Sequence, residues 1–156
     1  MTTADQPDLQ VAGRLGGISR LRSIELQELY WQVHPKIAPL DYPMPRISAA
    51  TELNFNGTIT PGAVNFGVWA NVRGLLEDGH ELFTLAARYV VGFGVPDDVS
   101  VTEAEVIAFG AVTVVAVVLP YIRQLVADVT SRAALPPLVL DTVRIPLPGR
   151  PPPTEP

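Results

Sequence analysis

The chain has 156 residues, which fits a single domain large enough to bury a core of its own. Its net charge is −5 and its 11 Lys and Arg residues are scattered, so we expect no nucleic acid as a partner. Cysteine is absent, which excludes disulfide bonds, thiolate zinc sites and a cysteine nucleophile. Hydrophobic residues make up 47% and charged residues 17%, an apolar balance that points to assembly with other copies.

Residues 1–20 are expected to form an N-terminal arm before the main domain. Residues 1–10, MTTADQPDLQ, lack the basic and apolar segments of a secretion signal, so we expect a cytoplasmic protein. Residues 8–14 can form one or two helical turns, which Gly16 and Gly17 would end. A loosely held arm is the alternative.

The segment of residues 21–34 alternates apolar and polar side chains in two phases. The phase shifts by one residue near Gln27 and Glu28, which predicts a strand with a β-bulge at that point. The apolar residues are Ile24 and Leu26 in the first phase and Leu29, Trp31 and Val33 in the second.

Three further strands follow, each with a clean period of two. The connections contain Pro61-Gly62 and Asp78-Gly79, and an Asp-Gly pair is a strong hairpin signal. We therefore expect an α+β fold in which a four-stranded antiparallel β-meander turns one apolar face to a helix. The apolar faces are Ile47, Ala49, Thr51, Leu53 and Phe55; Val64, Phe66, Val68, Ala70 and Val72; and Phe83, Leu85, Ala87, Tyr89, Val91 and Phe93.

A long helix is predicted from Glu103 to Arg132. Thr102 and Glu105 have the spacing of a capping box at its start, and Pro120 predicts a kink late in it. No charge occurs between residues 106 and 122, and a helix that is apolar all round needs burial on all sides, here against the sheet and other copies. The candidate oligomer interface residues are Val106, Phe109, Val112, Val115, Leu119 and Tyr121.

The same apolar run could instead span a membrane. Its 17 uncharged residues make about 25 Å of helix, against about 30 Å for the hydrocarbon core of a bilayer. Pro120 also interrupts the run. Shorter runs are more often buried core or interface helices, so we expect no stable membrane insertion.

Two segments rich in proline and apolar residues flank these elements. Residues 35–45, PKIAPLDYPMP, predict an adaptable apolar binding loop, with a simple lid over the core as the alternative. Residues 135–140, LPPLVL, form a second apolar loop, which either binds a ligand or packs back on the sheet. Six of the last eleven residues are proline, so we expect residues 146–156 to be a disordered tail.

No cluster of side chains suits catalysis. His34 and His80 stand alone at a strand end and in a turn. The Gly92-Phe93-Gly94 run lacks the third glycine of a dinucleotide-binding fingerprint. Glu103 and Glu105 fit a charge effect at a helix start. We therefore expect no enzyme activity, no metal and no cofactor.

The end of the predicted helix carries a family resemblance. Residues 119–123, LPYIR, precede Asp128, Thr130 and Arg132 and then residues 135–140, LPPLVL. These residues are similar to the Pro-Tyr-x-Arg segment of SecB-family chaperones and its Arg-x-x-x-Pro-x-Leu-x-Leu continuation. The likeness is greatest to the SecB-like chaperones of actinobacterial toxin-antitoxin-chaperone systems, which share an N-terminal Asp-Leu-Gln and a Pro-rich end.

The resemblance covers residues 8–148 and implies a SecB-like domain at residues 21–145, with the Pro-rich tail in place of the family's second helix. It also implies a homotetramer, built as a dimer of dimers, that holds unfolded chains without ATP. The apolar grooves would lie between the sheet, the loop after the first strand and the loop after the long helix. The client-binding residues implied by position are Tyr30, Trp31, Ile37, Leu40, Tyr42, Met44, Leu135, Leu138 and Leu140.

The resemblance leaves two roles open, export of unfolded preproteins and protection of a labile antitoxin. The acidic residues Glu25, Glu28, Glu77 and Asp78 do not align with the patch by which export chaperones dock the export motor, so motor binding is in doubt. The alternative function is a structural or inhibitory oligomer with the same fold and no general client binding.

Overall fold

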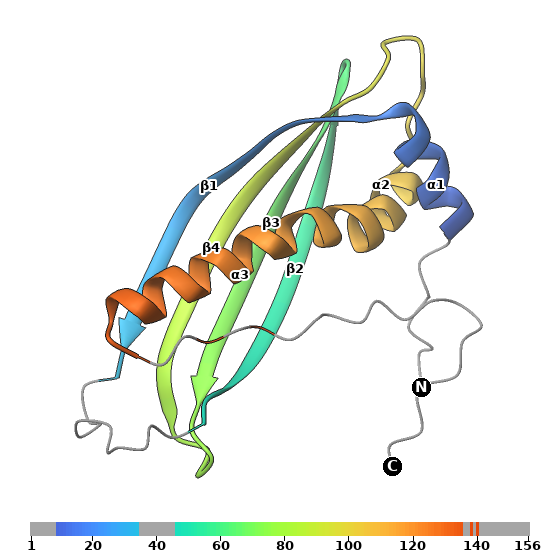
Figure 1. Cartoon of the computed structure of the whole chain (residues 1–156). Coiled ribbons are helices and arrows are strands. Elements are labelled where there is room, and N and C mark those ends of the chain that lie inside the picture. The colour runs from blue at the N-terminus through green and yellow to red at the C-terminus, as the bar shows by residue number, and fades with distance from the viewer. Residues whose placement is uncertain (1–8, 35–45, 136–137, 139, 141–156) are drawn as a thin grey trace, which may run out of the picture.

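The computed structural model describes residues 9–34 and 46–135 together with Leu138 and Leu140. One four-stranded antiparallel sheet carries a long helix across one face (Figure 1), so the predicted fold class is confirmed. The strands are β1 (Arg20–Val33), β2 (Ser48–Thr60), β3 (Ala63–Leu75) and β4 (Glu81–Gly94). The helices are α1 (Leu9–Ile18), α2 (Glu103–Phe109), the π-helical turn η1 (Gly110–Val114) and α3 (Val115–Arg132).

The strand order corrects the predicted meander. The sheet runs β1-β4-β3-β2, so only β2, β3 and β4 form a meander, while β1 pairs with β4. A hairpin connection has about two to five residues, whereas residues 34–47 separate β1 from β2, so no tight turn holds these two strands together. As a result β1 and β2 are the two edges of the sheet.

Strand β1 contains the predicted bulge. Its register against β4 shifts between Leu26 and Glu28, where the apolar alternation changes phase. A second shift between Leu21 and Ser23 was not predicted, although the three-residue spacing from Leu21 to Ile24 was its signal. Because bulges twist a strand and interrupt its pairing, two of them in one edge strand discourage the addition of further strands.

The predicted hairpin at Asp78-Gly79 is confirmed. Gly79 has a φ of +83°, in the left-handed region that the turn requires. The backbone N–H of Leu76 donates to the carbonyl of His80 at 2.9 Å, and the N–H of Gly79 donates back to Leu76 at 2.9 Å. This turn sets the register of β3 against β4.

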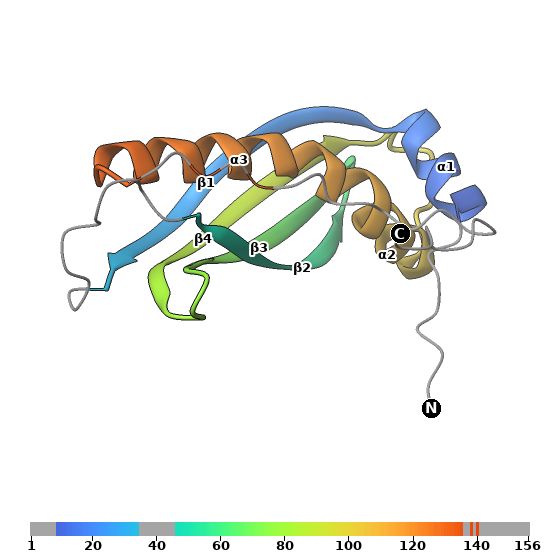
Figure 2. The same cartoon turned by 60° about the horizontal axis from the view of Figure 1, so that its bottom comes forward.

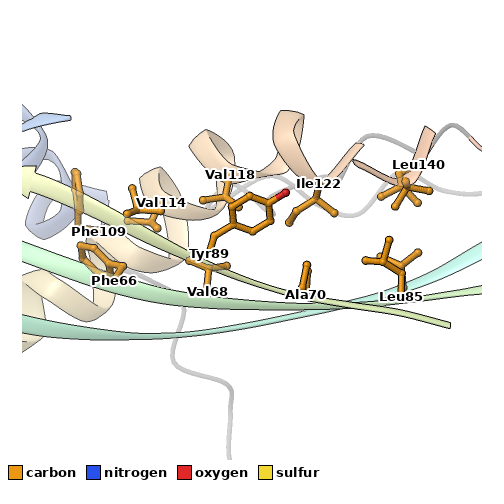
Figure 3. Close-up of a cluster of buried hydrophobic side chains, with 14 of the residues drawn as sticks. Phe66, Val68, Ala70, Leu85, Tyr89, Phe109, Val114, Val118, Ile122 and Leu140 are labelled. Atoms are coloured by element: carbon orange, nitrogen blue, oxygen red, sulfur yellow. The ribbon is translucent and has the colours of Figure 1, made fainter. Parts of the chain in front are cut away.

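The core lies between the sheet and the long helix. The predicted apolar faces of β3 and β4 are buried, and none of their side chains exposes more than 4% of its surface. Figure 3 shows Phe109, Val114, Val118 and Ile122 of the helix above this face. These residues are four apart except for the step of five from Phe109 to Val114, which spans η1. The extra residue of the π-helical turn keeps both halves of the helix facing the sheet.

The start of the long helix is built as predicted. The Oγ1 of Thr102 accepts a hydrogen bond from the N–H of Glu105 at 3.3 Å, and the N–H of Thr102 donates to the Glu105 carboxylate at 2.9 Å. Helix α1 packs beside this end (Figures 1 and 2), where Arg14 pairs with the same carboxylate.

Helix α1 is longer than predicted. It continues through Gly16 and Gly17 to Ile18, although each glycine costs about 1 kcal/mol in a helix interior. Ala12 and Leu15 of this helix are buried at 4% and 1% exposure, so residues 9–18 are packed on the core and not loosely held. Tertiary contacts outweigh the low helix propensity of glycine at this place.

By length and composition the helix Glu103–Arg132 is able to cross a membrane. Half of its most apolar stretch is buried inside the chain, which is also the pattern of a core helix in a soluble protein. The absence of membrane insertion therefore stays a prediction.

Candidate functional site

The long helix does not cover the whole apolar face of the sheet. The side chains of β1 on this face lie beside buried residues of β4, as the pairs Leu26–Tyr89 and Leu29–Ala87 show. Four of them, all aliphatic, nevertheless expose between 37% and 48% of their surface, while Ile24 and Trp31 on the same face pack against the core. We call this set the β1 stripe, and it consists of Leu21, Leu26, Leu29 and Val33.

Exposed aliphatic residues on the inner face of a sheet are unusual, because this is the face that folding normally buries. The sequence pattern assigned Leu26, Leu29 and Val33 to the core, and only the position of the helix leaves them open to solvent. Val33 is followed within two residues by the segment 35–45, the first predicted binding loop. The β1 stripe is therefore an exposed apolar surface whose Val33 end is next in sequence to that loop.

The two predicted aromatic anchors lie on opposite faces of the sheet. Trp31 is on the inner face, where its ring centroid is 4.7 Å from that of Phe83 and it packs against the core. Tyr30 is on the outer face and is 54% exposed. Adjacent residues of a strand point to opposite sides, so these two rings do not serve one site. Only Trp31 borders the β1 stripe.

On the outer face, Tyr30 lines a shallow cavity of about 250 Å³ with Trp69 and Arg88. The Arg88 guanidinium lies 5.3 Å from the Trp69 ring centroid, which is a cation–π contact. The same guanidinium donates to Glu28 at 3.0 Å. Glu28 thus has a basic partner on this face, which makes it a weaker candidate for an acidic docking patch.

The second predicted loop packs on the sheet. Leu138 and Leu140 expose 7% and 4% of their surface and belong to the core cluster, and Leu135 packs against that cluster. Figure 3 shows Leu140 above Leu85 of β4, next in line after Ile122 of the helix. In this structure these leucines cover the sheet and do not line an open groove.

Four predicted client-binding residues lie outside the described residues. They are Ile37, Leu40, Tyr42 and Met44 of the segment 35–45. Their role stays a prediction.

The candidate interface residues of the long helix fall into two groups. Val106, Phe109 and Leu119 are buried within the chain at 8% exposure or less, so they are not available to another copy. Val112 and Val115 are half-buried, and Tyr121 is 46% exposed. The sequence analysis missed Ile107, which is 57% exposed on the uncharged part of the helix.

Several of the described titratable groups form ion pairs, and none of these pairs resembles a catalytic centre. His34 Nε2 lies 3.2 Å from Glu81 and 3.1 Å from Thr84 at the end of β1. The hydrogen bond from Thr84, followed by that from His34, lowers the pKa of Glu81. Within residues 9–34 and 46–135, no three His, Cys, Asp or Glu side chains are placed to hold a metal ion.

Comparison with known proteins finds SecB-like chaperones both by sequence and by structure. The SecB-like chaperone Rv1957 of Mycobacterium tuberculosis strain H37Rv is 46% identical over 50 residues, as is the SecB-like chaperone MT2006 of strain CDC 1551. The solved structure of Rv1957, in complex with a ChAD peptide from the Rv1956 HigA1 antitoxin, superposes with a TM-score of 0.76 at 26% identity. The predicted resemblance to SecB-like chaperones is confirmed.

The two matches differ in extent. The sequence match spans 32% of this chain and 28% of the length of the curated relatives. The structural match to the SecB-like chaperone spans 88% of this chain and 99% of the solved one. No protein-family model matches the chain. The fold is therefore shared over nearly the whole chaperone, while sequence similarity is concentrated in a short part.

Proposed function

We propose that this protein is an ATP-independent chaperone of the holdase type, which binds unfolded or aggregation-prone polypeptides on its apolar surfaces. The observation that carries the proposal is the superposition, over 88% of this chain, with a SecB-like chaperone that holds a peptide from an antitoxin. The relatives are named as chaperones, which favours a role without enzyme chemistry. The proposed location is the cytoplasm.

The β1 stripe supports this function physically. Its leucines and valine present an exposed aliphatic surface, and burial of apolar surface is worth about 25 cal/mol per Å². Aliphatic contacts have no strict geometry, so such a surface accepts many sequences. Stripe residues Leu26 and Leu29, together with the loop of residues 35–45, are our proposed client surface.

We propose a homotetramer, assembled as a dimer of dimers, through the uncharged face of the long helix. Ile107 and Tyr121 are exposed there, and Val112 and Val115 are half-buried. Exposed apolar residues along an uncharged stretch of helix favour burial against another copy. Size-exclusion chromatography with light scattering measures the mass, and Ile107→Asp together with Tyr121→Asp is expected to lower it. A wild-type monomer would contradict this assembly.

Of the two roles left open by the sequence, we favour protection of an antitoxin over export of preproteins. The relative is bound to an antitoxin peptide. In addition, Glu28 forms an ion pair with Arg88 at 3.0 Å, so one of the four acidic residues considered for motor docking already has a basic partner. Export with motor docking is the second candidate role.

The decisive test is aggregation of a chemically unfolded client diluted into buffer, followed by light scattering with and without this protein and without nucleotide. We expect suppression at near-stoichiometric amounts. Leu26→Asp with Leu29→Asp should weaken suppression, while Glu52→Gln on the exposed polar side of β2 serves as the control. Folded wild-type protein that fails to suppress aggregation would favour the alternative, a structural or inhibitory oligomer without client binding.

A further inference from the structure

The outer face of the sheet, on the side away from the long helix, carries an unexpected set of side chains (Figure 2). Alternate residues of β2 and β3 point to this face, and four of them are asparagines. Asparagine is depleted in strands, because its side chain favours local hydrogen bonds to the backbone in turns. Residues that oppose local propensity are expected at functional or strained sites. We call these residues the asparagine set, which consists of Asn54, Asn56, Asn65 and Asn71.

Within the described part of the chain, the amides of the asparagine set have no hydrogen-bond partner. Other polar side chains of the outer face do have partners. Arg73 lies 3.9 Å from Glu52, and the hydroxyl of Tyr30 donates to Gln32 at 2.5 Å. Three of the four asparagines are exposed, and Asn65 is half-buried. Their donors and acceptors are therefore available to a ligand.

Trp69 lies among the asparagines, with Asn54 as its direct neighbour on β2. Its ring extends over Gly67, where an added Cβ would lie 3.0 Å from the ring and 2.8 Å from the side-chain oxygen of Asn56. The guanidinium of Arg88 lies 5.3 Å from the ring centroid. The glycine thus lets the indole lie along the sheet, bordered by amides and a guanidinium.

We propose that the outer face around Trp69 is a binding site for neutral saccharides. An amide both donates and accepts hydrogen bonds, as a sugar hydroxyl does, so the asparagine set matches a ligand that is covered with hydroxyl groups. The C–H face of a sugar ring is apolar and can pack on the indole, as other apolar groups pack on aromatic rings. The site lies on the opposite face of the sheet from the β1 stripe, so this inference goes beyond the proposed function.

The charges on this face favour an uncharged ligand. Arg88 pairs with Glu28 at 3.0 Å and Arg73 lies 3.9 Å from Glu52, so each arginine already has an acidic partner. The net charge of −5 also disfavours an anionic ligand. The cavity beside Trp69 has a volume of about 250 Å³, whereas pockets for drug-sized ligands have about 300–1,000 Å³. Its size therefore suits a single sugar ring.

The first test follows the fluorescence of Trp69 in the full chain. Trp31→Phe leaves Trp69 as the remaining one of two tryptophans. Cellotetraose, maltotetraose and mannotetraose are titrated as three neutral probes. At least one of them should change the emission of Trp69 in a saturable way. Calorimetry with that probe should then show binding to the wild type and binding about tenfold weaker to Trp69→Ala.

The second test separates a binding role of the asparagines from a structural one. Asn54→Thr with Asn56→Thr removes two amides from the site, and threonine has the higher strand propensity. The urea midpoint of this double variant should be unchanged or higher, while the saccharide should bind about tenfold more weakly because two hydrogen-bonding groups are lost. Ser48→Thr is the matched control, on the same strand and face but at the other end of β2, and should bind as the wild type does.

Three results would overturn the proposal. The first is no response to any of the three tetrasaccharides. The second is a lower urea midpoint of the double variant, which would show that the asparagines serve the fold. The third is a changed particle mass of the double variant in light scattering, which would make this face a contact between copies. Aggregation suppression is assigned to the other face, so it should be equal in the wild type and the double variant, and the two proposals can fail separately.

Discussion

The two ends of the long helix are held in different ways. At the N-terminal end, Glu105 closes the capping box and pairs with Arg14 of α1. At the C-terminal end, the chain turns through the strained Ala134 and rests Leu138 and Leu140 on the sheet. Hydrogen bonds and ion pairs require their partners in one geometry, whereas an aliphatic side chain can pack against many different apolar groups. The first end is therefore a polar anchor that includes an ion pair to another helix, whereas the second is held by a backbone turn and aliphatic contacts.

The largest expected effect is on the anchored half of the helix. A Cβ on Gly110 would lie 2.2 Å from the ring of Phe55, and both residues belong to the helix–sheet packing. Gly110→Val should therefore lower the free energy of unfolding by about 3 kcal/mol. Urea unfolding measures this. Gly13→Ala, where nothing lies within 4 Å, is the control and should cost nothing. An unchanged urea midpoint for Gly110→Val would contradict the close approach.

A smaller effect is expected from the anchor itself. Glu105→Ala removes the acceptor for the N–H of Thr102 and the partner of Arg14, and should cost about 2 kcal/mol of stability. Glu105→Gln keeps an oxygen acceptor and loses only the charge, so it should cost about half as much. Thermal unfolding of both variants compares them. Equal losses would show that the ion pair, and not the capping box, holds this end.

The stabilisation that the anchor provides should also depend on pH, whereas Leu135, Leu138 and Leu140 at the other end have no titrating side chain. The hydrogen bond from the N–H of Thr102, followed by that from Arg14, lowers the pKa of Glu105 below its ordinary value of 4.5. A depressed folded pKa stabilises the protein above pH 4.5 and ceases to do so as pH falls through the folded pKa. The urea concentration at the unfolding midpoint should thus decrease as the pH is lowered below 4.5. The midpoint of Glu105→Gln should decrease less steeply over the same range. If the midpoints of the wild type and Glu105→Gln changed with pH in parallel, Glu105 would not contribute to the loss of stability in acid.

The smallest effect is expected at the C-terminal end of the long helix. Ala134→Gly should raise the free energy of unfolding by about 1 kcal/mol, because glycine adopts a φ of 54° without strain. The matched reverse change is Gly79→Ala at a φ of 83°, where no atom lies within 4 Å and the cost of about 1 kcal/mol comes from the backbone alone. Urea unfolding measures both. Destabilisation by Ala134→Gly would mean that the turn is not strained.

Features that depend on neighbouring residues could be predicted from the sequence. The capping box at Thr102, the hairpin at Gly79 and the bulge between Leu26 and Glu28 were all predicted, and all three are confirmed. Each depends on a few residues within one turn or strand, whose preferences act before any tertiary contact forms. The buried faces of β3 and β4 could also be predicted, because the alternation of side chains along a strand is a local pattern.

Predictions that required distant contacts were less accurate. Helix α1 continues through Gly16 and Gly17 because Leu15 is buried beside α2, a contact between segments that are far apart in sequence. The position of β1 beside β4 has the same origin, since residues 34–47 are too long a connection for a hairpin that would pair β1 with β2. The π-helical turn lets both halves of the long helix pack on the same sheet. Because this depends on the sheet, the sequence of the helix alone did not predict it.

The sequence by itself determined which segments are strands, where the long helix begins and ends, and that the apolar residues exceed the needs of one small core. Only the tertiary structure decided which of these residues stay exposed. Leu26 and Leu29 have the same alternation as the buried residues of β4, yet they are open, whereas Leu138 and Leu140 of a predicted loop are buried. Burial depends on which element lies above a side chain, and that is settled by packing between segments far apart in the chain.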